Sequence, residues 1–129
     1  MSAYTIKNLM DIEDSASGQA GGVEARFARR HIDSDHLGVT YMSYAPDTRA
    51  PMGHSHREQE EVYVILSGSG TIKLNEDVHE LRQWDVVRIA PSTWRALHSG
   101  SDGLVLIAVG NDRPEGGYGV RAPAEWWSA

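Results

Sequence analysis

The chain has 129 residues, of which 40% are hydrophobic and 23% charged, a composition typical of one globular domain with its own core. There is no cysteine, which excludes disulfides and thiolate zinc sites, so any metal has to be held by His, Glu, Asp or Gln. The net charge of −6 provides no basic face for a phosphate backbone, and nucleic acid is therefore not expected as a partner.

The N-terminal segment, residues 1–18, has neither the apolar stretch of a signal peptide nor the basic composition of a transit peptide. No run of ~18 apolar residues occurs anywhere in the sequence. We therefore expect a cytoplasmic protein without a membrane partner.

Short segments rich in β-branched and aromatic residues follow one another along the chain. The periodicity of residues 24–30 does not decide between a strand and a helical turn. Strands are expected at 39–44, 62–66, 71–74, 78–81, 86–89, 94–98 and 104–109. Turns are predicted where Gly, Asn and Asp gather, at 67–70, 75–77, 83–85 and 99–103. This spacing predicts an all-β fold, a small antiparallel barrel or sandwich, in a single domain over residues 1–129.

Two of the expected strands, residues 62–66 and 104–109, are apolar on both faces, whereas a strand with one face in water alternates. Val62, Val64 and Leu66 would form the outer face of the first of them. Either the N-terminal segment or a second subunit has to cover this face, and we expect a homodimer. The tryptophans of the C-terminal tail are expected to pack on the barrel or on a partner.

The stretch GHSHREQEEVYVILSG, residues 53–68, contains two histidines one residue apart, followed by paired glutamates. In a strand, His54 and His56 project from one face with Cα atoms roughly 7 Å apart, a spacing that suits one shared ion. Glu61 is five residues beyond His56, so the chain has to turn or bulge before the carboxylate can join the imidazoles. Mixed nitrogen and oxygen donors suit a divalent metal such as Mn, Fe, Ni, Co or Zn. Taken alone, these residues would also fit an exposed loop.

This stretch resembles the first motif of the cupin superfamily, in which Glu follows His-x-His after three or four residues and Gly follows Glu after six more. His54, His56, Glu61 and Gly68 have this spacing, whereas Glu60 does not keep the interval to the glycine. The resemblance implies an antiparallel double-stranded β-helix, the jelly-roll or cupin barrel. It also implies that the two histidines and Glu61 are metal ligands on the inner face of that barrel.

The second cupin motif runs Gly, five residues, Pro-x-Gly, two residues, His, three residues, Asn, and it corresponds to residues 84–99. Its length and apolar frame are kept here, but each defining residue is replaced. The replacements are Trp84, Ala90, Ser92, Arg95 and Ser99, and Thr48 stands for the leading glycine of the first motif. Arg95 therefore occupies the position of the family's fourth metal ligand. The resemblance covers roughly residues 38–110.

An arginine at position 95 changes the electrostatics expected of the site, because a guanidinium is always charged. At ~5 Å from a divalent ion, with an effective dielectric of ~20, the repulsion is roughly 6–7 kcal/mol. Two arrangements follow. In the first, the three ligands hold a metal weakly and Arg95 binds an anionic substrate beside it. In the second, Arg95 replaces the metal by a bidentate salt bridge to Glu61.

Alternation along the strands assigns the remaining candidates. Tyr63, Ile65 and Ser67 share the face of Glu61 and are expected to line the same cavity, where Tyr63 would contact the substrate, although it would fit the core equally well. His98 lies three residues beyond the arginine and would need a bulge to become a fourth ligand. The other histidines have no ligand spacing and are expected on the surface or in packing: His31, His36 and His79.

Cupins include enzymes of several kinds as well as binding proteins, so the resemblance does not select an activity. The altered second motif favours a small-molecule-binding protein, with Arg95 and Tyr63 contacting an anionic ligand beside a weakly bound divalent metal and with no nucleotide cofactor. The intact histidines and glutamate favour an alternative, a metal-dependent oxidoreductase or isomerase acting on a small carboxylate. The strands that are apolar on both faces favour a third possibility, a structural or interaction dimer.

Overall fold

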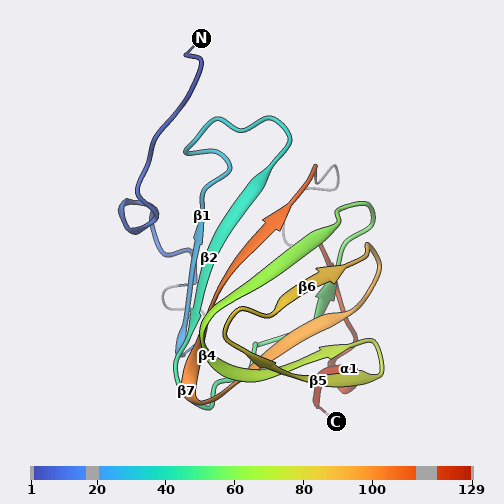
Figure 1. The fold of residues 1–129 in the computed structure, drawn as a ribbon. Helices are drawn as coiled ribbons and strands as arrows, with labels where there is room; N and C mark the ends of the chain where they lie inside the picture. The colour runs from blue at the N-terminus through green and yellow to red at the C-terminus, as the bar shows by residue number, and fades with distance from the viewer. Residues whose placement is uncertain (1, 17–20, 113–118, 129) are drawn as a thin grey trace.

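The computed structural model describes residues 2–16, 21–112 and 119–128, almost all of them in strands and the connections between strands (Figure 1). The strands are β1 (Val23–Phe27), β2 (Gly38–Tyr44), β3 (His54–Ser55), β4 (Glu61–Leu74), β5 (Asp77–Arg82), β6 (Val86–Ile89), β7 (Arg95–Gly110) and β8 (Val120–Arg121). A 3-10 helix, η1 (Leu9–Asp11), precedes them, and a short helix, α1 (Ala124–Ser128), follows them. The ambiguous segment 24–30 therefore contributes a strand, β1, followed by a turn.

The strands form one curled antiparallel sheet, which confirms the predicted all-β jelly-roll fold. Its order is β1-β2-β7-β3-β8, with β4 beside β7 and with β5 and β6 beside β4. The first half of β4 pairs with β6 and its second half with β5. In the same way, β7 pairs with β2 through its C-terminal half and with β3 at its first residue. Both long strands thus run through the two halves of the barrel.

Two predicted turns, at residues 67–70 and 99–103, are wrong, because these segments lie inside β4 and β7. The strands bend there while they stay paired. Gly68 and Gly103 have φ values of +79° and +77°, in the left-handed region that favours glycine. Since a β-bulge and a turn use the same residue types, composition did not distinguish a bent strand from two strands.

The register between β4 and β7 shifts twice at this bend, between Ile65 and Ser67 and between Gly68 and Gly70. The alternation of side chains is therefore interrupted. Tyr63 and Ile65 point into the barrel as predicted, but Ser67 is exposed and does not line the cavity. The prediction for Ser67 failed because it assumed an unbroken strand.

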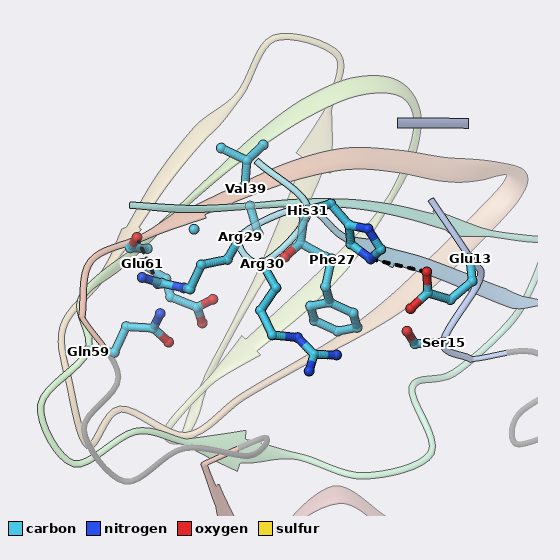
Figure 2. A pocket seen from close by; sticks show the side chains of 13 residues that line it. Glu13, Ser15, Phe27, Arg29, Arg30, His31, Val39, Gln59 and Glu61 are labelled. Atoms are coloured by element: carbon cyan, nitrogen blue, oxygen red, sulfur yellow. Dashed lines mark hydrogen bonds and ion pairs between the residues drawn. The ribbon is translucent and has the colours of Figure 1, made fainter. Parts of the chain in front are cut away.

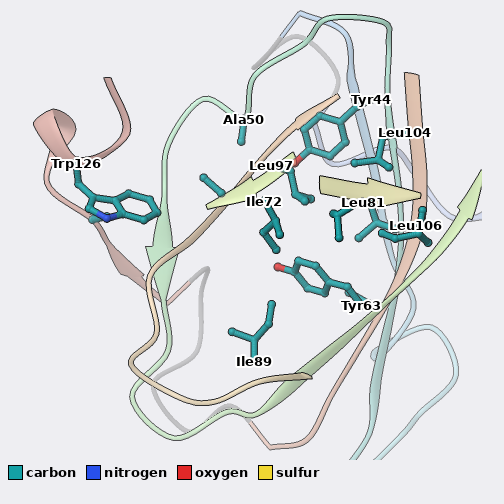
Figure 3. Close-up of a cluster of buried hydrophobic side chains, with 14 residues drawn as sticks. Tyr44, Ala50, Tyr63, Ile72, Leu81, Ile89, Leu97, Leu104, Leu106 and Trp126 are labelled. Carbon is teal, nitrogen blue, oxygen red and sulfur yellow. The ribbon is translucent and has the colours of Figure 1, made fainter. Parts of the chain in front are cut away.

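Apolar side chains from every part of β4 and β7 fill the interior (Figure 3). Ile65 and Leu106 are fully buried opposite each other, and the Tyr63 ring lies among them with 2% of its surface exposed. Burial raises the pKa of Tyr63 well above its ordinary value, so its hydroxyl group stays neutral. The remaining large members of the core include Ile72, Leu81, Ile89, Leu97 and Leu104.

The C-terminal helix is fixed to the barrel by its tryptophans. The Trp126 ring is 93% buried, lies edge-on to Trp94 with ring centroids 5.7 Å apart, and donates a hydrogen bond from Nε1 to the carbonyl oxygen of Asn75. Trp127 Nε1 donates to the carbonyl oxygen of Ala50 at 2.6 Å. These contacts close one side of the barrel, next to β3.

The outer face of the sheet remains apolar. Val62, Val64 and Leu66 are half-buried, and the neighbouring Val86 is 66% exposed. Residues 2–8 do not cover this face, since all of them are exposed and the segment leads away from the barrel. None of the helices in the described part of the chain has the length and apolar character needed to span a bilayer.

At the bend of β4 and β7, one added methyl group should strongly lower the stability of the fold. A Cβ atom at Gly68 would overlap the carbonyl oxygen of Gly103, and the positive φ adds to the cost. We expect Gly68→Ala to lower the free energy of unfolding by more than about 1 kcal/mol in urea denaturation. Gly21→Ala is the matched control, because nothing lies within 4 Å of its Cβ position. Equal stability of the two variants would contradict the role assigned to the bend.

Candidate metal centre

The three predicted ligands come together at one end of the barrel. His54 lies in β3, opposite Arg95 of β7, and His56 follows at the end of that strand. Residues 57–60 bend before β4 begins at Glu61, as the odd spacing required. The candidate donor atoms of His54, His56 and Glu61 all lie within 4.8 Å of one another. No fourth His, Asp or Glu among the described residues joins this group.

His56 is the most tightly positioned of the three. Its side chain is 3% exposed, and Nε2 lies 3.3 Å from Glu61 Oε1. Its carbonyl oxygen accepts a hydrogen bond from the Ser92 N–H at 2.5 Å. On the other side, a Cβ atom at Gly119 would come within 2.5 Å of His56 Nδ1, so the glycine leaves room for the ring. The backbone thus fixes this imidazole against the carboxylate.

Arg95 is buried next to the carboxylate, with 1% of its side chain exposed. Its Nη1 lies 3.6 Å from Glu61 Oε1, and its Nη2 donates to the carbonyl oxygen of Ala90 at 3.2 Å. Within the described residues, Nη1 and Nε have no hydrogen-bond partner, and neither has Glu61 Oε1. The structure therefore has one long ion pair in place of the bidentate bridge that the second arrangement requires.

The charge state of Glu61 suits a ligand. Burial by itself raises the pKa of this carboxyl group, but the adjacent His56, the charge of Arg95 and the nearby His54 together outweigh it. The pKa of Glu61 therefore lies below its ordinary value. At neutral pH the site presents a carboxylate, which is the form that binds a cation.

The donor set fits a first-row divalent ion. The donor atoms of His56 and Glu61 lie 3.3 Å apart. With each donor ~2.1 Å from one ion, the donor–ion–donor angle is roughly 100°, between the octahedral and tetrahedral values. The His54 donor lies within 4.8 Å of the other two, near the ~4.2 Å that is the largest separation of two donors on one ion. Glu61 Oε1, buried without a hydrogen-bond partner in the described residues, is an acceptor that an ion would satisfy.

A cavity of about 320 Å³ opens beside this centre (Figure 2). Gln59 and Glu61 lie at one end of it, and His31 and Glu13, whose Nε2 and Oε2 atoms are 3.1 Å apart, lie at the other. Arg29, Arg30 and Phe27 lie between the two ends. The cavity has the size of a small-molecule site, and its charged lining consists of Arg29 and Arg30 with Glu13 and Glu61 at the two ends.

The other predicted residues fall into two groups. Tyr63 lies in the core, and neither it nor Arg95 is among the residues that line the cavity. His98 pairs with Thr71 in an unbroken stretch of the ladder from Arg95 onward, so it stays on the opposite face from Arg95. His36 and His79 are exposed, as expected, whereas His31 lines the cavity.

Sequence reasoning missed Arg29, Gln59 and the pair of Glu13 with His31. They come from the N-terminal segment, the turn after β1 and the bend before β4, which are far apart in the sequence. The available signal was the adjacent pair Arg29–Arg30, two positive charges that can attract a small anion. No periodicity could have placed Gln59 in the cavity, because it lies outside any strand.

The family pattern described as Cupin domain matches residues 40–110. A cupin protein from Bacteroides fragilis has a similar structure, with 24% identity, a TM-score of 0.69 and coverage of 92% of each chain. A variant of oxalate decarboxylase from Bacillus subtilis has a TM-score of 0.72 at 16% identity, covering 85% of this chain and 31% of that one. A polyketide cyclase from Streptomyces resistomycificus has a TM-score of 0.69 at 17% identity, covering 84% and 80%. No curated protein matches the sequence.

Proposed function

Because the chain belongs to the cupin family, we propose that it binds a small anionic molecule beside a weak divalent-metal site made by His54, His56 and Glu61. The observation that carries the proposal is the convergence of these donors within 4.8 Å of one another. Three protein ligands leave coordination positions for water or for a ligand oxygen. A bound Mn, Fe, Ni or Zn ion would supply a positive charge that orients the anion.

Arg95 explains both the weakness of the metal site and its preference for an anion. Its guanidinium lies 3.6 Å from the carboxylate that would bind the ion, so it repels the ion, while Glu61 attracts both. Its Nε and Nη1 atoms, which have no hydrogen-bond partner in the described residues, can donate to an anionic ligand that reaches this depth. Any contact of Tyr63 with this ligand would be made by its hydroxyl group, which stays neutral.

A metal-dependent enzyme is the second candidate function. The open coordination positions favour it, because a catalytic metal site keeps such positions for substrate. The reaction would be an oxidation or isomerisation of a small carboxylate held by Arg95. Turnover that requires both the metal and His54 would separate this function from binding alone.

The metal site is tested by restoring a neutral donor. We expect Arg95→His to raise the affinity for a divalent ion at least about tenfold, equivalent to ~1.4 kcal/mol, because it removes a charge and adds an imidazole. Isothermal titration of both proteins with Mn, Fe, Ni and Zn measures this change.

The control is His54→Ala in the Arg95→His background, which should abolish the gain. Two results would sink the proposal: unchanged affinity in Arg95→His, or tight binding by the wild type that survives His54→Ala. Circular dichroism checks that both variants keep the fold, since Arg95 is buried.

We also propose that the protein forms a homodimer through its outer sheet face. On this face Val64 pairs with Val86 of β6 and with Ile107 of β7, so apolar side chains continue across three strands. An apolar sheet face of this kind is normally covered.

Sedimentation velocity should therefore show a dimer at micromolar concentration. Val86→Glu, at a position that is already 66% exposed, should shift the protein to a monomer without unfolding it. Val78→Glu on β5, at a position 62% exposed, is the control and should leave the dimer unchanged. A monomeric wild type would refute the proposed dimer.

A further inference from the structure

Two glycines face each other in the row of the sheet that contains Glu61. Gly110 pairs with Gly38 of β2 on one side and with Glu61 of β4 on the other. A Cβ atom at Gly38 would lie 2.7 Å from Arg29 Nη2, and one at Gly110 would lie 2.5 Å from Gln59 Nε2. Because the two glycines have no side chains, Arg29 and Gln59 occupy the space next to them. Both residues line the cavity beside the candidate metal centre.

Arg29 is held in this place by backbone carbonyl groups. Its Nη2 donates to the carbonyl oxygens of Asn111 at 2.5 Å and of Gly110 at 3.4 Å. Across the described segments of the chain, it forms no ion pair with a carboxylate. A positioned guanidinium whose charge is not neutralised attracts an anion, and Arg30 adds a second charge along the same cavity.

Gln59 lines the cavity and has a buried hydrogen-bond acceptor. Its Nε2 donates to the carbonyl oxygen of Asn111 at 3.1 Å, which fixes the orientation of the amide group. The residue is 96% buried, and its Oε1 has no hydrogen-bond partner among the residues the structure describes. A buried acceptor without a partner is costly, so a ligand that brings a hydroxyl group here is favoured.

We infer that this cavity binds a small carboxylate that also carries hydroxyl groups, with its carboxylate on Arg29 and Arg30 and a hydroxyl group donating to Gln59 Oε1. The ring of Phe27, beside Arg30 in the cavity, would contact the carbon chain of the ligand (Figure 2). The inference rests on the proposed function, because it names the ligand class of the same barrel. A monoanion is favoured over a phosphate dianion because Glu13 and Glu61 line the two ends of the cavity.

The experiment compares three unbranched six-carbon probes by isothermal titration of EDTA-treated protein: gluconate, hexanoate and sorbitol. Gluconate has the carboxylate and the hydroxyl groups, and each of the others lacks one of them. We expect gluconate to bind at least tenfold more tightly than either, and more tightly than inorganic phosphate. Equal affinity for gluconate and sorbitol, for gluconate and hexanoate, or for gluconate and phosphate overturns the inference.

Variants assign the two contacts separately. Arg29→Gln should lower the gluconate affinity to that of sorbitol, and Gln59→Leu should lower it to that of hexanoate. Gly38→Ala should displace the end of the Arg29 side chain and weaken gluconate binding at least fivefold while the fold is kept, as circular dichroism would show. Arg82→Gln and Gly21→Ala, away from the cavity, are the controls and should bind like the wild type. Loss of binding in the controls, or its retention in both Arg29→Gln and Gln59→Leu, contradicts the assignment.

A separate titration of the same protein with Mn²⁺ distinguishes this inference from the proposed metal site. Mn²⁺ binding that depends on His54, without selective gluconate binding, overturns the inference alone. Gluconate binding without any metal binding supports the inference and overturns the metal site. If neither ligand binds, both proposals fail.

Discussion

The pairing of β4 with β7 is the constraint on which the site depends. The register places Glu61 opposite Gly110 at one end of the ladder and Leu74 opposite Arg95 at the other. Because both strands bend where Gly68 meets the chain of β7, the two ends curl toward each other. Arg95 and Glu61, which belong to opposite ends of the ladder, thereby come within 3.6 Å of each other. A straight ladder would hold them far apart, at ~3.3 Å for each residue between them.

This arrangement leaves the charge of Arg95 buried and incompletely paired. Arg95 is 99% buried, yet two of its three guanidinium nitrogens have no hydrogen-bond partner in the described residues. Burial of a charge without full hydrogen bonding is unfavourable, and sequences keep such groups mainly where function requires them. The apolar core formed by Ile65, Leu104 and Leu106 supplies the stability that offsets this cost. The unsatisfied groups of Arg95, Glu61 and Gln59 lie at one end of the barrel, where a ligand would meet them.

The sequence was sufficient for the fold class and for the cluster of His54, His56 and Glu61, and insufficient for the cavity. His54, His56 and Glu61 could be found because their spacing is local and each lies in or next to a strand. Ser67 was misplaced because a register shift cannot be read from alternation. The position of the Arg29 side chain depends on Gly38 of β2, so it follows from packing and not from any motif.

The central claim is that His54 and His56 share one ion. Long-range proton–nitrogen NMR of the histidine side chains, recorded while Mn²⁺ is added below one equivalent, tests it most directly because the ion broadens the signals of its own ligands first. We predict that the His54 and His56 imidazole signals broaden before those of His31, His36, His79 and His98. Broadening that begins at His31 or His36, the two histidines that already lie beside carboxylates of Glu13 and Asp112, would contradict the claim.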